Sequence, residues 1–286
     1  MKVQKSIDLK PFTTFKVGGE AEFFFMGSSQ KELVEIIDWA NQKNLPINIL
    51  GGGSNVIISD VGLSGLLLLN KAGKLEIFDD YVRVESGTSL KTLNNELLKK
   101  GKGGLEALAN IPGTVGGAIV GNVGAYRKFI GDFLKEAKVL YDGKVETVGP
   151  EFFEFEYRNS KLKKGFDAVI LEVTLSINDI DPKESLNRIL EDKKSREMKH
   201  PSEPSCGSYF KNPSKEKIAG SLIEGVGLKG YRIGDAMVSE KHANFLINKG
   251  NAKAADVKRL ADYIKKKVFE ETGEKLEEEV KYLGEF

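Results

Sequence analysis

The chain has 286 residues, 40% of them hydrophobic, which is enough for a substantial core and about two domains of ordinary size. Its 43 lysines and arginines nearly balance its 42 aspartates and glutamates, so the net charge of +1 gives no overall field that favours nucleic acid or an anionic membrane. The single cysteine, Cys206, excludes an internal disulfide framework and fits a reducing compartment. With only two histidines, His200 and His242, we expect no metal site.

The N-terminus, MKVQKSIDLK, lacks the apolar core of a signal peptide. No segment approaches the roughly 18 apolar residues that a membrane-spanning helix requires. We therefore expect a cytoplasmic protein that binds neither membrane nor nucleic acid, with a monomer as the default state.

Hydrophobic periodicity and turn residues predict the elements in chain order. A capping box at 29–32 opens the first helix, and the pair Asp142-Gly143 marks a hairpin. Gly273 follows the last apolar residue of the long helix and is predicted to be its C′ glycine. The expected helices begin near Gln30, Leu90, Pro182, Lys217 and Ala254, and the expected strands cover 47–50, 56–59, 81–86, 138–141, 144–148, 168–177, 244–248 and 276–283.

This mixture of hairpins and helices favours an α+β fold over a doubly wound sheet. We expect a first domain of two α+β lobes over residues 1–178, a helical connection over 179–200 and a smaller α+β domain over 201–286. The charge-rich stretch after 178 predicts the connecting helix, because Pro182 suits a first helical turn.

Two glycine-rich segments carry most of the functional information. Ile111–Tyr126 holds five glycines and no charged side chain, and Gly51-Gly52-Gly53-Ser54-Asn55 follows the apolar run Ile47–Leu50. The segment at 51–55, called the first glycine segment because it comes first in the chain, would on its own more often be a tight turn, and it matches neither a Walker loop nor a Rossmann fingerprint. The segment at 111–126 is the second glycine segment. Together, the two segments predict a cradle that holds a diphosphate through backbone amides, and hence a nucleotide cofactor.

Several motifs in series resemble one enzyme family, the UDP-N-acetylenolpyruvoylglucosamine reductases. The resemblance runs through nearly the whole chain and is carried in order by residues 11–19 (PFTTFKVGG), 51–55 (GGGSN), 111–117 (IPGTVGG), 157–160 (YRNS), 206–213 (CGSYFKNP), 241–245 (KHANF) and 277–280 (EEEV). Any one of these motifs is weak, but the series is specific.

The resemblance implies the FAD-binding fold of vanillyl-alcohol oxidase-like enzymes in the first domain and substrate binding in the last. It implies that NADPH reduces noncovalently bound FAD, which then reduces the enolpyruvyl group on UDP-N-acetylglucosamine to give UDP-N-acetylmuramate, a peptidoglycan precursor. The expected cofactor-binding residues are Gly51, Gly52, Gly53, Ser54, Asn55, Pro112, Gly113, Thr114, Gly116, Gly117, Gly121 and Asn122.

Three residues match the catalytic residues of the family. Arg158, which on general grounds would be a surface ion-pair residue, is expected to bind the substrate carboxylate as charge develops on it. Ser208, otherwise a turn residue, is expected to donate the proton. Glu279 is expected to help stabilise the enediolate, although Glu277 and Glu278 stand beside it and leave this assignment open.

The resemblance also implies substrate contacts at Tyr157, Lys211 and Asn212, and we expect His242 to line the substrate pocket. Residues 159–207 contain no tyrosine, so the chain resembles the shorter type of the family, which lacks an inserted tyrosine loop. Cys206 is expected to be structural, because a flavin carries the redox chemistry.

Two other functions stay open from the sequence. One is a different FAD-dependent oxidoreductase on the same fold, acting on a small alcohol, and the other is a non-catalytic FAD-binding protein. The presence of Arg158, Ser208 and Glu279 argues against both, because neither function has a use for residues that protonate an enediolate.

Overall fold

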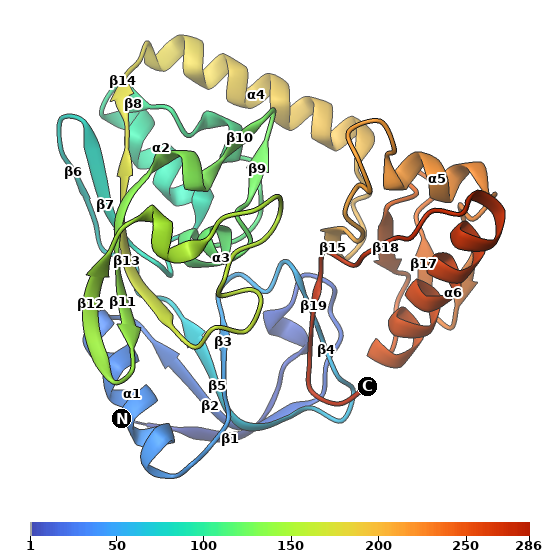
Figure 1. Ribbon diagram of the computed structural model, residues 1–286, viewed down its shortest axis with the longest axis horizontal. Helices are drawn as coiled ribbons and strands as arrows, with labels where there is room; N and C mark the ends of the chain where they lie inside the picture. The colour runs from blue at the N-terminus through green and yellow to red at the C-terminus, as the bar shows by residue number, and fades with distance from the viewer. Residues whose placement is uncertain (1) are drawn as a thin grey trace. The chain divides into compact units, whose positions relative to one another are not determined.

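The computed structural model describes residues 2–286 (Figure 1). Contacts divide the chain into two compact units that are assembled from separated segments. Unit 1 contains residues 2–3 with Phe25–Gly52 and Leu67–Lys194, and unit 2 contains Gln4–Phe24, Gly53–Leu66 and Ser195–Phe286. The chain therefore passes repeatedly from one unit to the other. The functional domains expected at 1–178, 179–200 and 201–286 stay a prediction.

Unit 1 is built on a five-stranded antiparallel sheet in the order β12-β11-β13-β7-β6. The predicted hairpin is confirmed, since Asp142 and Gly143 both have positive φ and connect β11 to β12 as a two-residue turn requires. The strands are β6 (Leu75–Ile77), β7 (Tyr81–Glu85), β11 (Leu134–Tyr141), β12 (Lys144–Val148) and β13 (Val169–Ser176).

The core of unit 1 lies on the face of this sheet that carries Val173 and Leu175 of β13. Buried side chains of α2 (Leu90–Lys99) and α3 (Val115–Val120) pack in the same cluster. Each fully buried aliphatic side chain of this kind contributes about 1.5–3 kcal/mol through removal of apolar surface from water. The core therefore holds the glycine-rich helix α3 directly against the sheet.

Helix α1 (Gln30–Gln42) begins as the capping box predicts, but with one difference. The Ser29 hydroxyl accepts a hydrogen bond from the Glu32 N–H at 3.3 Å. The Glu32 carboxylate accepts its bonds from the N–H and hydroxyl of Ser28, both at 2.7 Å, rather than from the Ser29 N–H. Ser28 is thus an additional capping residue.

The remaining elements of unit 1 are short except for α4 (Pro182–Lys199), which continues into unit 2. The Asn110 side chain fixes α4 by donating to the Ile189 carbonyl at 2.9 Å. Strands β2 (Glu20–Gly27) and β5 (Leu63–Asn70), whose residues are divided between the two units, belong to the sheet β1-β2-β5-β3, in which β1 is Gln4–Asp8. The other short strands of unit 1 are β3 (Ile47–Leu50), β8 (Lys102–Gly103), β9 (Gly124–Ala125), β10 (Lys128–Phe129) and β14 (Asn178–Asp179). Three 3₁₀ turns lie in unit 1, at Glu106–Leu108, Ile130–Phe133 and Pro150–Phe153, and the turn at Lys10–Phe12 belongs to unit 2.

Unit 2 is built on the antiparallel sheet β15-β18-β17-β16, against which α6 packs. Helix α6 (Ala254–Thr272) has the predicted bounds, and Gly273 follows it in the left-handed conformation, as predicted. The other elements are β1 (Gln4–Asp8), β4 (Val56–Ile58), β15 (Ser205–Ser208), α5 (Ala219–Gly225), β16 (Arg232–Ile233), β17 (Ala236–Val238), β18 (Phe245–Asn248) and β19 (Lys281–Leu283).

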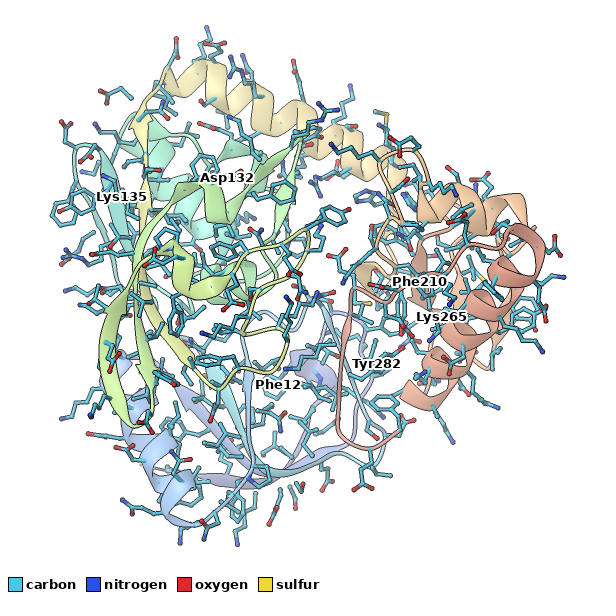
Figure 2. The ribbon with its side chains drawn as sticks, in the orientation of Figure 1. Phe12, Asp132, Lys135, Phe210, Lys265 and Tyr282 are labelled. Atoms are coloured by element: carbon cyan, nitrogen blue, oxygen red, sulfur yellow. The ribbon has the colours of Figure 1, made fainter. Side chains whose placement is uncertain are left out.

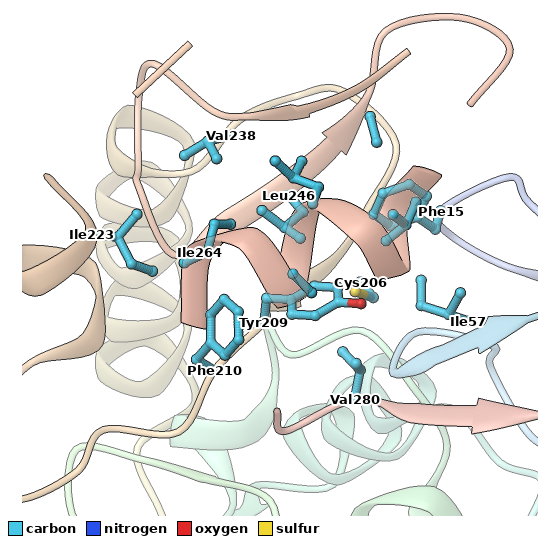
Figure 3. Packing of buried hydrophobic residues seen from close by; sticks show 14 of the residues in the cluster. Phe15, Ile57, Cys206, Tyr209, Phe210, Ile223, Val238, Leu246, Ile264 and Val280 are labelled. Atoms are coloured by element: carbon cyan, nitrogen blue, oxygen red, sulfur yellow. The ribbon is translucent and has the colours of Figure 1, made fainter. Parts of the chain in front are cut away.

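The core of unit 2 joins residues that are far apart in the sequence (Figure 3). Phe15 and Ile57 from the N-terminal segments pack in the same cluster as Cys206, Leu246 and Ile264. The Asn248 side chain strengthens this arrangement by donating to the Phe15 carbonyl at 3.1 Å. Residues 4–24 and 53–66 are therefore part of the folded C-terminal region.

The predicted strand over 276–283 is wrong in its first half. Only Lys281–Leu283 forms a ladder, and it pairs in parallel with β4. Leu276–Val280 makes one isolated bridge, between Phe210 and Glu278, before the chain changes partner. Among residues 2–286, no helix is both long and apolar enough to cross a membrane.

Candidate active site

The two glycine segments touch within unit 1. A Cβ atom on Gly51 would lie 2.3 Å from the Thr114 hydroxyl oxygen, and one on Gly52 would lie 2.9 Å from the Gly113 Cα. No L-residue with a side chain fits at either position without displacing the opposite segment. Within residues 2–286, the backbone N–H groups of Gly52, Gly113 and Thr114 donate no backbone hydrogen bond. These N–H groups, on two backbone segments that approach each other closely, fit a flavin diphosphate held by amides.

The rest of the first glycine segment lies in unit 2. Gly53 has φ +62° and packs on Phe12, whose carbonyl oxygen would lie 2.0 Å from a Cβ atom at Gly53. Asn55 binds the C-terminal segment, since its side-chain Nδ2 donates to the Glu279 carbonyl at 3.2 Å and its own carbonyl accepts from the Lys281 N–H at 3.1 Å. Ser54 lies between these two residues.

The second glycine segment continues into α3. Gly116 packs on Ser86, because its N–H donates to the Ser86 carbonyl at 2.8 Å and a Cβ atom would lie 2.8 Å from the Ser86 Cβ. The Gly117 N–H donates to the Thr114 hydroxyl that caps α3, and Gly121 ends the helix. Pro112 precedes this segment.

Asn122 follows α3 with φ +40° and is only 7% exposed. Its Nδ2 donates to the Glu156 carbonyl at 2.9 Å, and its Oδ1 accepts from the Gly131 N–H at 3.2 Å. The side chain predicted as a cofactor contact thus binds backbone groups at both of its polar atoms.

Arg158 is in a two-residue turn of unit 1. Glu156 and Asn159 exchange backbone hydrogen bonds at 3.1 and 3.2 Å, with Tyr157 and Arg158 between them. Arg158 has φ +56°, and its carbonyl accepts from the Lys163 ammonium group at 3.0 Å. Tyr157 is 49% exposed. The predicted catalytic arginine and its neighbour therefore share one tightly bonded turn.

Ser208 ends β15 in unit 2 and is exposed, and Gly207 before it has φ +79°. Tyr209 next to it is fully buried in the cluster shown in Figure 3, and its hydroxyl lies 2.6 Å from that of Tyr282. Burial raises the pKa of the Tyr209 hydroxyl. Ser208 therefore faces solvent beside a residue that is anchored in the core.

The serine segment pairs with the segment of the three glutamates. The Glu279 N–H donates to the Tyr209 carbonyl and the Lys211 N–H to the Glu277 carbonyl, both at 2.8 Å, around the bridge of Phe210 with Glu278. This antiparallel register places Glu279 opposite Tyr209, one residue from Ser208. The structure thus pairs the backbone segments that carry two of the three predicted catalytic residues.

The three glutamates differ in their surroundings. The Glu277 side chain is 75% exposed and lies 3.4 Å from the Lys211 ammonium group. The Glu278 carboxylate forms an ion pair at 2.7 Å with the ammonium group of Lys265 on α6, a residue labelled in Figure 2. Glu279 is half-buried, and both its N–H and its carbonyl are hydrogen-bonded. Which of the three glutamates takes part in the reaction stays a prediction.

The predicted substrate residues of unit 2 lie around the same segment. Asn212 accepts a hydrogen bond from the Ala219 N–H at 3.0 Å and so fixes the start of α5. The His242 Nδ1 accepts from the Asn244 N–H at 3.2 Å, and its ring lies 4.9 Å from that of Phe245. Burial lowers the pKa of His242.

Cys206 is buried in the hydrophobic cluster of unit 2, where burial raises the pKa of its thiol (Figure 3). A thiol in such surroundings stays protonated and is a poor nucleophile. This placement fits the structural role that was expected for it.

Sequence reasoning missed the role of Asn244. Its Oδ1 accepts from the Phe210 N–H at 2.9 Å, and its Nδ2 donates to the Phe210 carbonyl at 2.8 Å. One side chain thus replaces a strand partner beside Ser208. The available signal was an asparagine directly before an apolar strand, where a polar side chain needs hydrogen-bond partners once it is buried.

Comparisons with known proteins agree with this fold. Residues 21–149 match the FAD binding domain family, and residues 199–283 match the C-terminal domain of UDP-N-acetylenolpyruvoylglucosamine reductase. The protein is therefore a flavoprotein with an α+β, FAD-binding fold, as predicted. The chain belongs to the UDP-N-acetylenolpyruvoylglucosamine reductase family, because it is similar over its full length to members of that family.

Three relatives illustrate the similarity. The reductase of Acaryochloris marina is 41% identical over 100% of this chain and 94% of its own length. That of Caldicellulosiruptor bescii is 40% identical over 99% of this chain and 91% of its own. The crystal structure of the reductase from Thermus caldophilus has a TM-score of 0.84 and 34% identity, covering 99% of this chain and 100% of that one.

Proposed function

We propose that this protein reduces the enolpyruvyl group of UDP-N-acetylglucosamine enolpyruvate to give UDP-N-acetylmuramate in the cytoplasm, with NADPH as the reductant. The full-length similarity to reductases of this name supports the activity. The observation that carries the assignment is the pairing of the Ser208 segment with the Glu279 segment. A small-alcohol oxidase has no need for a hydroxyl donor and a carboxyl group on two paired segments.

The two glycine segments would hold FAD. When bound, FAD supplies the hydride that it takes from NADPH. The N–H groups of Gly52, Gly113 and Thr114 would donate to the diphosphate, and Gly51 allows the close approach of the two segments. The tight packing of Gly53 and Gly116 keeps these segments in place. No histidine lies in either segment, which supports noncovalent binding. Ser54, Pro112, Gly117 and Gly121 belong to the same proposed cradle.

Arg158 is proposed to bind the substrate carboxylate. Hydride addition to the methylene carbon of the enolpyruvyl group leaves negative charge on the carbon that bears the ether oxygen, and this charge spreads into the carboxylate as an enediolate. A planar guanidinium binds a carboxylate through two parallel hydrogen bonds, which strengthen as the charge grows. The bonded turn around Arg158 reduces its freedom to leave that position.

Ser208 is proposed to donate its hydroxyl proton to the carbon that bears the ether oxygen. The exposed position of Ser208 lets its hydroxyl reach a substrate, while buried Tyr209 fixes the backbone beside it. A serine hydroxyl is a weak acid, but the carbanionic carbon is a much stronger base than water, so the transfer is favourable at close range.

Glu279 is proposed to share in stabilising the enediolate. Its backbone supports this choice, because the Glu279 N–H donates to the carbonyl of Tyr209, the residue that directly follows Ser208. Tyr157, Lys211, Asn212 and His242 are proposed to bind the rest of the UDP-sugar, and the enzyme is proposed to be a monomer.

Flavin absorbance tests this function directly. The purified protein is followed anaerobically while NADPH and then the enolpyruvyl UDP-sugar are added. Bleaching by NADPH and rapid recovery on addition of the sugar are expected. Bleaching without recovery would contradict the proposed substrate, and a protein that takes up no FAD would contradict the proposed cradle.

A further inference from the structure

The backbone of the Arg158 turn is held at both ends by residues that directly follow or end α3. At the entry, the Asn122 Nδ2 donates to the Glu156 carbonyl at 2.9 Å. At the exit, the fully buried Ser160 donates its hydroxyl to the Val120 carbonyl at 2.6 Å. All these residues belong to unit 1.

Asn122 is built for this contact rather than for contact with a ligand. Its φ of +40° lies in the left-handed region, which asparagine tolerates better than most residues. Its Oδ1 is occupied by the Gly131 N–H, so the orientation of the amide is fixed and the Nδ2 faces Glu156. One amide hydrogen and one oxygen lone pair are therefore engaged by backbone groups, and the side chain is almost fully buried, so its position is fixed by the protein itself.

The same short helix carries the second glycine segment at its start. Thr114 caps α3, and Gly113 and Gly116 pack tightly against Gly52 and Ser86. The helix has six residues, so the glycine segment and the arginine turn are joined by a rigid element about 9 Å long at 1.5 Å per residue. A change at Asn122 would loosen the entry of the turn at Glu156, while Ser160 still holds its exit and the glycine segment stays in place.

We propose that Asn122 is a positioning residue, which holds the Arg158 turn at a fixed distance from the glycine segment. The proposal rests on the function proposed above, in which Arg158 binds the substrate carboxylate. Two-point binding of a carboxylate depends on alignment, and a displacement of roughly 1 Å at a reacting group costs on the order of 100-fold in rate. Asn122 would therefore affect reduction of the substrate without touching it.

Asn122→Gly is the first variant to test, because glycine accepts the positive φ and the change removes only the side chain. Asn122→Asp is the second, since it keeps the shape and loses the donor to Glu156. We expect wild-type FAD content and flavin reduction by NADPH, with reoxidation by the enolpyruvyl UDP-sugar slowed about 10- to 100-fold. The matched control is Asn94→Ala, which removes another buried asparagine, whose side chain donates to the Leu90 carbonyl within α2.

A double-mutant comparison separates positioning from a general structural role. In an Arg158→Ala background, Asn122→Gly should slow reoxidation by less than about twofold, because the group that it positions is gone. A full further loss in that background, loss of FAD from either Asn122 variant, or equal slowing by Asn94→Ala would each overturn the proposal. If the wild-type flavin is not reoxidised by the sugar, or if Arg158→Ala reoxidises normally, the proposed function itself fails first.

Discussion

The side-chain amide of Asn55 donates a hydrogen bond to the backbone carbonyl of Glu279 at 3.2 Å. The carbonyl of Asn55 in turn accepts from the Lys281 N–H at 3.1 Å. The last residue of the first glycine segment therefore fixes the backbone on both sides of Val280. Within unit 2, the same stretch is bonded on its other edge to Tyr209. The backbone of the proposed catalytic glutamate is thus held between the first glycine segment and the segment that carries Ser208.

Asn55→Ala tests whether this contact matters for the reaction. Loss of one hydrogen bond of this kind costs about 0.5–1.5 kcal/mol, so reoxidation of the flavin by the enolpyruvyl UDP-sugar should slow about three- to tenfold. We expect FAD content to stay close to wild type, measured from the absorbance of the purified protein. Asn95→Ala, at an exposed position on α2, is the control and should change neither quantity. Loss of FAD alone would instead favour the predicted cofactor contact.

Ser208→Ala tests the proposed proton donor. Removal of a positioned general acid costs about 100- to 10,000-fold, so reoxidation by the sugar should fall by that factor while flavin reduction by NADPH stays near wild type. Stopped-flow absorbance measures the two half-reactions separately. Ser205→Ala, at the other end of β15, is the matched control. Equal slowing of both half-reactions would contradict the role.

Gly52→Ala tests the glycine cradle. A methyl group at this position would lie 2.9 Å from the Gly113 Cα, so one of the two segments must move. We expect FAD binding to weaken by at least tenfold, measured by ultrafiltration of the released flavin. Gly225→Ala is the control, because a Cβ atom there meets nothing within 4 Å. If both variants retained FAD equally, the contact of the two segments would not shape the cofactor site.

Much of this arrangement could be predicted from the sequence, where the signals are local. The Asp142-Gly143 turn, the bounds of α6 and the glycine at 273 follow from backbone preferences of single residues. The order of the motifs predicted the family. The grouping of Phe15 and Ile57 with the C-terminal core depends on packing between distant segments, which no local pattern encodes.

The hydrogen-bond partners of Asn55 and Asn122 could not be predicted from the sequence either. Asn55 and Asn122 stand in segments that predict a cofactor site, and nothing in the sequence shows that their amides bind the carbonyls of Glu279 and Glu156. The break in the strand predicted over 276–283 has the same origin. That segment leaves one partner for another at Lys281, and a change of partner follows from the tertiary arrangement.

His242 predicts a dependence of stability on pH. Burial lowers its pKa in the folded protein, with Lys229 adding to the effect and Glu224 opposing it. The unfolded chain, with a histidine pKa of about 6.5, therefore binds more protons in the window below that value. Stability should fall as the pH drops through this window and be restored above it. Thermal unfolding at pH 7.5 and 5.5 should show a smaller difference for His242→Gln than for wild type, and an unchanged difference would contradict the buried neutral state.

Asn244 and Asn248 offer a matched pair for the serine segment. Both are buried beside or within β18, and both use their side chains to bind backbone. Asn244 binds the N–H and carbonyl of Phe210, whereas Asn248 binds the Phe15 carbonyl and the amides of Gly250 and Ala252. Because each alanine variant leaves buried backbone groups unsatisfied, each should lose about 2–4 kcal/mol of unfolding free energy.

Only the Asn244 variant should also change the reaction. Phe210 is bonded to the Asn244 side chain on one edge and forms a bridge with Glu278 on the other. Loss of the Asn244 side chain should therefore loosen the pairing of the Ser208 segment with the Glu279 segment. Reoxidation by the enolpyruvyl UDP-sugar, measured well below the unfolding temperature, should slow about tenfold in Asn244→Ala, equivalent to about 1.4 kcal/mol, and stay near wild type in Asn248→Ala. Equal rates in the two variants would show that the pairing of Phe210 with Asn244 stabilises unit 2 without positioning Ser208.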